Sequence, residues 1–134
     1  MTMLARHTPQ EAYRRVEMDA RVNGSDARQL VSLCYEQMIS ALGSALHAAG
    51  HGDNRGKSAA MTRAMASLTA LQLGVSGDTG VAAALRHFYE SARRTLLDNV
   101  LAFDAVAVSV LRQDFINIGR ATGASGTAGA AHES

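Results

Sequence analysis

Residues 50–58, GHGDNRGKS, end in the three residues that close a nucleotide-binding P-loop. A P-loop requires Gly-x-x-x-x-Gly-Lys-[Ser/Thr] after a buried strand, because its successive backbone N–H groups must cradle phosphate oxygens. Five residues before Gly56 stands His51, and Gly50 and Gly52 are each one position out of register. The preceding residues, ALGSALHAA, have helical rather than strand periodicity. We therefore interpret this stretch as a helix–helix turn and expect no nucleotide or other cofactor.

Three further patterns are weak candidates for chemistry. His47 and His51 are four residues apart and could share a helix face. Asp53 is a weak candidate for a third ligand and no other is evident nearby, so a metal site is not predicted. Cys34, the only cysteine, lies within an apolar pattern and is expected to be a small buried hydrophobe. The carboxylates are scattered, mostly on polar faces, so no paired-carboxylate site is predicted. We expect neither a metal nor a catalytic activity.

Charge and hydropathy limit the class of partner. The formal net charge is +1, which is too small for the basic surface that nucleic-acid binding normally needs. The opening MTMLARHTPQ contains no signal-like apolar run, and no segment approaches the ~20 apolar residues needed to span a bilayer. We expect a cytoplasmic protein that neither binds nucleic acid nor inserts into a membrane.

The elements that would position these residues are helices. Alanine is abundant and there is one proline, a composition that favours helices. Asp26 is the expected N-cap of the first long helix, with Gln29 as a capping-box partner. Although AVAVSV alternates locally like a strand, the longer pattern is helical and begins after a capping Asp104. Periodicity predicts long helices over residues 26–49, 57–73, 79–100 and 104–118.

Short Gly/Asp/Asn connections between such helices predict an all-α fold, an antiparallel up-and-down four-helix bundle. The predicted divisions are residues 1–22 with a short helix, the bundle over residues 23–118, and a disordered tail over residues 119–134. The third long helix is expected to direct seven apolar residues to the core: Val81, Leu85, Phe88, Tyr89, Ala92, Leu96 and Val100.

Some apolar residues exceed what a simple bundle needs. The first long helix has a continuous apolar arc of roughly 180°, from Leu30 and Val31 onward, so it contacts at least two other helices, or one helix and a ligand. Leu33 nevertheless falls on its polar face, and Val106 and Val110 fall on the back of the last helix. Tyr13 and Val16 share one side of the short N-terminal helix. This pattern favours a groove that receives another helix.

The sequence also resembles the flagellin-export chaperones of the FliS family. GSDARQLVSLCYEQM is similar to that family's T-A-S-P-x-x-L-I-x-M-L-Y-D-G-A motif, with Tyr35 at the tyrosine position. FYESARRTLLDN is similar to L-Y-x-Y-x-x-R-R-L-x-x-A-N, with Asn99 at its last position, and Tyr13 matches an N-terminal tyrosine. Asp26 and Ala27 replace the Ser-Pro of the first motif, and Gln37 replaces its glycine. The resemblance covers about residues 11–118.

The resemblance implies a cytoplasmic chaperone that binds the disordered C-terminal segment of flagellin in hydrophobic grooves. Such a chaperone would prevent premature polymerisation of flagellin and deliver flagellin to the flagellar type III export gate, without catalysis. We expect a monomer or weak homodimer, in which the N-terminal segment covers part of the groove when flagellin is absent. The expected partner-binding residues are Tyr13, Val16, Leu33, Tyr35, Val106 and Val110. The alternative is a helical-bundle interaction module of another secretion or regulatory system.

Overall fold

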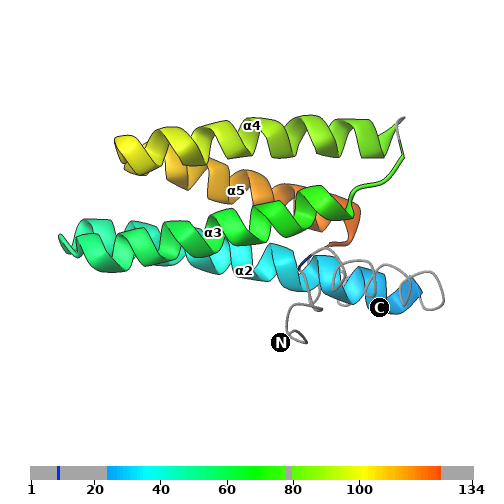
Figure 1. Cartoon of the computed structure of the whole chain (residues 1–134), viewed down its shortest axis with the longest axis horizontal. Helices are drawn as coiled ribbons and strands as arrows, with labels where there is room; N and C mark the ends of the chain where they lie inside the picture. Colours follow the sequence, from blue (N-terminus) through cyan, green and yellow to red (C-terminus); the bar gives the residue numbers. More distant parts are fainter. Residues whose placement is uncertain (1–8, 10–23, 78–79, 125–134) are drawn as a thin grey trace, which may run out of the picture.

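The computed structural model describes residue 9 and residues 24–77 and 80–124. The described residues form four long helices, α2 (Gly24–Gly50), α3 (Asn54–Gly74), α4 (Val81–Leu101) and α5 (Ala105–Thr122). The α2–α3 and α4–α5 turns lie at one end of the elongated molecule, and the α3–α4 connection lies at the other (Figure 1). Helices α2 and α4 each pack against both α3 and α5. The predicted all-α antiparallel bundle is confirmed, while the predicted short helix and residues 125–134 lie outside the described residues.

The core lies along the bundle axis and contains side chains from all four of these helices. Its large fully buried members are three aromatic rings and five aliphatic or thioether side chains: Tyr35, Tyr89, Phe115, Met38, Leu42, Leu68, Leu96 and Val108. Small buried residues such as Ala45, Ala64 and Ala92 separate them. Alternating large and small side chains lets facing helices interdigitate closely, which explains how a chain with few aromatic residues fills its core.

The residues that resembled a P-loop form a turn and a helix start. Asp53 is the N-cap of α3, and its Oδ1 accepts a hydrogen bond from the Gly56 backbone N–H at 2.9 Å. A Cβ added at Gly56 would collide with the Asp53 carboxylate, so glycine is needed there for the cap. Helix α3 therefore begins three residues before the predicted start at Lys57, because the cap belongs to Asp53.

Helix α5 begins where the sequence predicts. Asp104 accepts hydrogen bonds from the N–H groups of Val106 and Ala107, at 3.0 and 3.3 Å. AVAVSV is helical, as expected. The helix continues to Thr122, four residues past the expected domain boundary, and Gly119 is buried within it. It ends at Gly123, whose φ of 76° is the left-handed conformation typical of a glycine C-cap.

The N-terminal half of α2 differs from the expectation in two ways. The helix begins at Gly24, so Asp26 lies in its first turn instead of at the N-cap. An acidic side chain still favours the positive end of the helix dipole from that position. Leu30 and Val31, which begin the apolar arc expected to contact other helices or a ligand, are exposed. The buried stripe of α2 starts only at Tyr35.

Two arginines of α4 act in packing. Arg93 donates from Nε to Oε1 of Gln72 at 2.8 Å and from Nη2 to Oγ1 of Thr69 at 2.7 Å, which ties α4 to α3. Arg86 donates to the carbonyl of Gly77 in the α3–α4 connection. Arg93 and Arg86 thus hold α4 to α3 and to the α3–α4 connection.

Candidate protein-interaction surface

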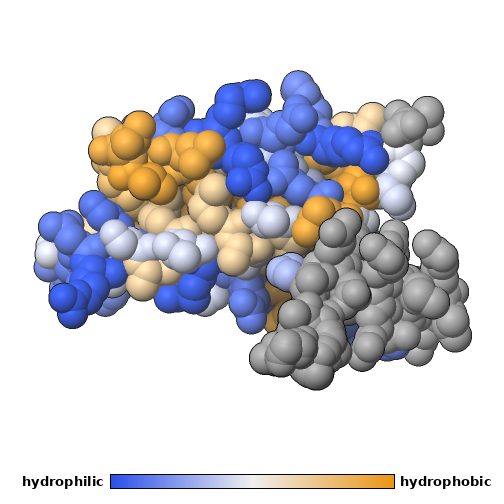
Figure 2. All heavy atoms as spheres, viewed as in Figure 1, coloured by the Kyte–Doolittle hydropathy of each residue, from blue (hydrophilic) through white to orange (hydrophobic). Residues whose placement is uncertain are grey.

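Exposed apolar side chains gather at the C-terminal end of α4. Leu97 is exposed, Val100 is 60% exposed and Leu101 is 89% exposed. Figure 2 shows the corresponding apolar patch at that end of α4, beside the more polar surface of the helix middle. Leu96 is buried and the consecutive Leu97 is exposed, because a helix can direct only one of two neighbouring residues fully to the core. At the end of the helix both Val100 and Leu101 remain exposed.

A groove of about 220 Å³ lies beside this patch, between the first half of α3 and the end of α4. We call it the α3–α4 groove. Its lining is Lys57, Ser58, Met61, Thr62, Met65, Asn99 and Val100. Met61 is buried and Met65 half-buried, so thioether side chains form its apolar part. Methionine is flexible and polarizable, and surfaces that bind varied apolar partners use it often.

The start of α3 is fixed against the α4–α5 turn. Lys57 Nζ lies 5.1 Å from the ring centroid of Phe103, a cation–π contact. Asn99 is buried, and its Oδ1 accepts a hydrogen bond from the Asp104 backbone N–H at 2.6 Å, while its Nδ2 donates to the Thr95 carbonyl at 2.8 Å. These contacts hold one end of the α3–α4 groove in a defined shape.

Val106 and Val110 lie one helical turn apart on α5, just after the α4–α5 turn. They are 72% and 56% exposed, as the sequence predicted from their position on the back of the helix. Together with Leu97, Val100 and Leu101 they form what we call the α4–α5 end. Apolar side chains are therefore displayed on both sides of that turn.

Leu33 is 48% exposed on α2 and belongs to a different part of the surface. The Nε of Arg112 donates to the Ile39 carbonyl at 3.0 Å, which sets the level of α5 against α2. Because the two helices are antiparallel, Leu33 and Val106 are separated by roughly 20 Å along the axis, at ~1.5 Å per residue. The structure therefore brings together Val106 and Val110 but not Leu33.

Tyr35 is not a surface residue. It is 1% exposed, its hydroxyl lies 2.7 Å from the hydroxyl of Tyr89, and its ring meets Phe115 edge-on at 5.6 Å. Burial raises the pKa of the Tyr35 hydroxyl well above its usual range. The expectation that Tyr35 contacts a partner is corrected: its position in the apolar arc of α2 places it in the core. Tyr13 and Val16 lie outside the described residues.

The α4 part of this surface was not predicted from the sequence. Val100 and Val81 were expected in the core, yet Val100 borders the α3–α4 groove and Val81 is 67% exposed at the opposite end of α4. Leu97 and Leu101 were not expected to contribute. The consecutive apolar pairs at 96–97 and 100–101 were the available signal.

The other candidate sites have structural explanations. His51 and His47 have ring centroids 4.2 Å apart, and His51 Nδ1 lies 2.9 Å from the His47 carbonyl oxygen. In the described part of the chain no three His, Cys, Asp or Glu side chains are grouped to hold a metal. Burial raises the pKa of the Cys34 thiol, which disfavours the reactive thiolate. Among the described helices, none is long and apolar enough to cross a membrane.

Comparison with known proteins gives one family match. The family described as "Flagellar protein FliS" matches residues 9–115, most of the chain. No curated protein and no solved structure matches.

Proposed function

Since the chain belongs to the FliS family, a family of flagellar export chaperones, we propose that it binds the C-terminal segment of flagellin and prevents premature polymerisation. The segment folds into amphipathic helices that lay their apolar faces on the bundle. The observation that carries this proposal is the cluster of Leu97, Val100 and Leu101 beside the α3–α4 groove. Contiguous exposed apolar surface on a soluble helical bundle typically marks a protein-interaction site.

The energetics favour an extended contact. Burying apolar surface contributes about 25 cal/mol per Å². Ordering a disordered partner costs about 1–2 kcal/mol per residue for the backbone. The α3–α4 groove is too small to offset the ordering of several helical turns, so the partner must also cover other apolar residues. Val106 and Val110 on α5, and Leu33 on α2, are exposed and available for this role.

The remaining predicted residues take different roles in the proposal. Tyr13 and Val16 cover part of the apolar surface when flagellin is absent and leave it when the partner binds. Tyr35 supports the surface from within the core through its hydrogen bond to Tyr89. The protein acts in the cytoplasm as a monomer or weak homodimer and passes flagellin to the flagellar type III export gate.

Isothermal titration calorimetry with the C-terminal segment of flagellin from the same organism tests this function. The Val100→Glu variant places a charge on the edge of the α3–α4 groove and should weaken binding at least about ten-fold, because a charge buried against an apolar face is poorly solvated. Val81→Glu is the matched control, since Val81 is similarly exposed on the same helix but at its other end. It should leave the affinity unchanged.

The absence of any heat of binding to the unmodified protein would rule out the proposal. If Val81→Glu and Val100→Glu weaken the affinity for the flagellin segment equally, the α3–α4 groove is not part of the binding site. A pull-down from lysate separates the remaining alternative, because a module of another secretion or regulatory system would recover a partner other than flagellin. Circular dichroism of both variants should retain the helical spectrum.

A further inference from the structure

Lys57 is the only lysine of the chain, and it lies at one end of the α3–α4 groove. The other cationic side chains are arginines. Among the residues that line the groove, only Lys57 carries a charge, and the lining contains no carboxylate. The groove is therefore positive at the end beside the α4–α5 turn and apolar or neutral along the rest of its length.

The ammonium group of Lys57 is held at this end of the groove by an aromatic ring. Its Nζ lies 5.1 Å from the ring centroid of Phe103 in the α4–α5 turn, and both residues are half-buried. The ring face attracts the positive charge on one side of the ammonium. An ammonium carries three N–H donors, so donors remain for an oxygen acceptor on its other side. A carboxylate can therefore approach Lys57 while the contact with Phe103 is kept.

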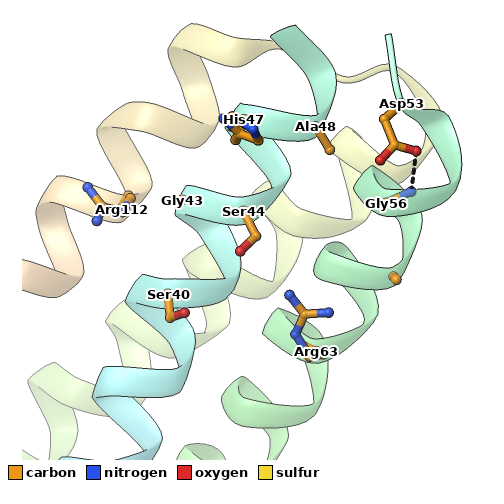
Figure 3. A pocket seen from close by; sticks show the side chains of 10 residues that line it. Ser40, Gly43, Ser44, His47, Ala48, Asp53, Gly56, Arg63 and Arg112 are labelled. Atoms are coloured by element: carbon orange, nitrogen blue, oxygen red, sulfur yellow. Dashed lines mark hydrogen bonds between the residues drawn. The ribbon is translucent and has the colours of Figure 1, made fainter. Parts of the chain in front are cut away.

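The charge of Lys57 has no ion-pair partner among the described residues. Asp53 lies one helical turn before it, but the Asp53 carboxylate accepts a hydrogen bond from the Gly56 N–H at the start of α3 (Figure 3). Asp104 lies in the α4–α5 turn, and its carboxylate caps α5 in the same way. Because both of these aspartates serve as helix caps, the positive charge of the groove is left for a bound partner to neutralise.

The apolar and positive parts of the groove follow one another along α3. Lys57, Met61 and Met65 are spaced four residues apart, which places them in one row along the helix. Lys57 and Met61 are separated by ~6 Å along the helix axis, at ~1.5 Å per residue. A partner helix that lays its apolar face on the two methionines therefore reaches Lys57 with a side chain three or four residues from the one that covers Met61.

A partner helix without an acidic residue at that position would bind at a cost. It would cover Lys57 and remove water from an ammonium that has no counter-charge, whereas an ion pair offsets this loss. The lone charge thus disfavours partners that lack the acid. We propose that the α3–α4 groove selects an amphipathic helix with an Asp or Glu at the edge of its apolar face, and that Lys57 pairs with this carboxylate. The inference rests on the proposed function, since the helix belongs to the bound flagellin segment.

Calorimetry with the full-length protein tests the pair. The titrants are the C-terminal segment of flagellin from the same organism and variants of it in which each Asp or Glu is replaced in turn by Asn or Gln. Lys57→Gln should weaken binding of the unmodified segment about ten-fold, because it removes a charge-assisted hydrogen bond. One segment variant should lose a similar factor, and the two changes together should lose little more than either alone. Absence of heat with the unmodified segment contradicts the proposed function, whereas binding that is unaffected by Lys57→Gln overturns the ion pair alone.

Arg63→Gln is the matched control, because it removes the same charge from the same helix. Arg63 is exposed on the side of α3 that faces α2, where it lines a separate depression with Ser40 and Ser44 (Figure 3). The change should leave the affinity for the segment within about two-fold of the parent. Equal losses for Arg63→Gln and Lys57→Gln would mean that net charge attracts the segment, and would overturn the proposal.

The single lysine also allows the contact to be located directly by carbodiimide cross-linking. The reagent joins an amine to a carboxylate that touches it, and Lys57 carries the only side-chain amine of the chain. Mass spectrometry should find an amide bond between Lys57 and an Asp or Glu of the segment. Lys57→Arg keeps the positive charge but lacks the reactive amine, so this product should disappear. A link from Lys57 to the terminal carboxylate of the segment, or no link through Lys57 at all, would overturn the proposal.

Discussion

The hydroxyl oxygens of Tyr35 and Tyr89 lie 2.7 Å apart in the core and join α2 to α4, two helices that face each other across the bundle. The Phe115 ring packs against both, edge-on to Tyr35 at 5.6 Å and nearly parallel to Tyr89 at 6.4 Å. One hydroxyl donates a hydrogen bond to the other in surroundings that are otherwise apolar. Such a buried polar pair favours one arrangement of facing helices over alternatives that would leave the groups unpaired.

Tyr35→Phe should therefore destabilise the bundle more than the loss of one oxygen suggests. It leaves the Tyr89 hydroxyl buried without a partner, which costs about 1–3 kcal/mol of unfolding free energy. The double variant Tyr35→Phe/Tyr89→Phe removes both groups and should lose much less than the sum of the single losses. Urea unfolding of the four proteins in a double-mutant cycle measures this coupling. Additive losses would show that the pair does not interact.

The same pair makes stability sensitive to alkaline pH. Burial raises the pKa of both Tyr35 and Tyr89 above their usual range in the folded protein. Their contribution is fully present below the unfolded pKa of about 10 and is lost as pH rises further, because the unfolded chain then releases protons more readily. The double phenylalanine variant should show a shallower loss of unfolding free energy between about pH 10 and 12. Identical slopes in the two proteins would contradict this assignment.

Asn99 should be a sensitive position, although asparagine is a modest helix former. It joins the last turn of α4 to the Asp104 backbone through its two side-chain hydrogen bonds. Asn99→Ala leaves the Asp104 N–H without that partner, and we expect a loss of about 1–3 kcal/mol in urea unfolding. Asp98→Ala, at the exposed neighbouring residue, should change stability by about 0.5 kcal/mol or less. Comparable losses in the two variants would mean that the Asn99 contacts are not the cause.

The helix caps predict how much unfolding free energy is lost when each of three aspartates is replaced by alanine. Asp104→Ala and Asp53→Ala each remove a side-chain cap and should cost about 0.5–2 kcal/mol. Asp26→Ala removes only a charge in the first turn of α2 and should cost about 0.3–1 kcal/mol. Thermal unfolding followed by circular dichroism measures the order. A loss for Asp26→Ala as large as that for Asp104→Ala would indicate that Asp26 caps α2 after all.

Val110→Glu tests whether α5 contributes to partner binding. Val110 is exposed, so the variant should keep its helical circular dichroism while its affinity for the flagellin segment falls at least about ten-fold, because the new charge is poorly solvated under the partner. Leu33→Glu makes the same change on α2, at the other part of the surface. Weakening by Val110→Glu alone would confine the contact to the α4–α5 end, and weakening by both would extend it along the bundle. Loss of helical structure in Val110→Glu would show that Val110 supports the core.

Local patterns determined the helices and their order. The periodic apolar stripes specified four long amphipathic helices, and the caps at Asp53 and Asp104 set where α3 and α5 begin. The run AVAVSV was correctly predicted as helix because its longer context has helical spacing. These features depend on residues within a few turns of one another, so the sequence alone contains the relevant interactions.

Only the tertiary structure decided which apolar residues remain exposed. Periodicity placed Val100 with Leu96, but α4 ends beside α3 in a way that buries Leu96 and leaves Val100 on the edge of a groove. Periodicity also placed Tyr35 in the apolar arc of α2, and its hydrogen bond to the Tyr89 hydroxyl across the core shows that it is internal rather than a contact residue. The Arg112 contact with Ile39, which sets the level of α5 against α2, joins residues 73 apart in sequence. Interhelical distance and register create such contacts, and neither is encoded in the spacing along a single helix.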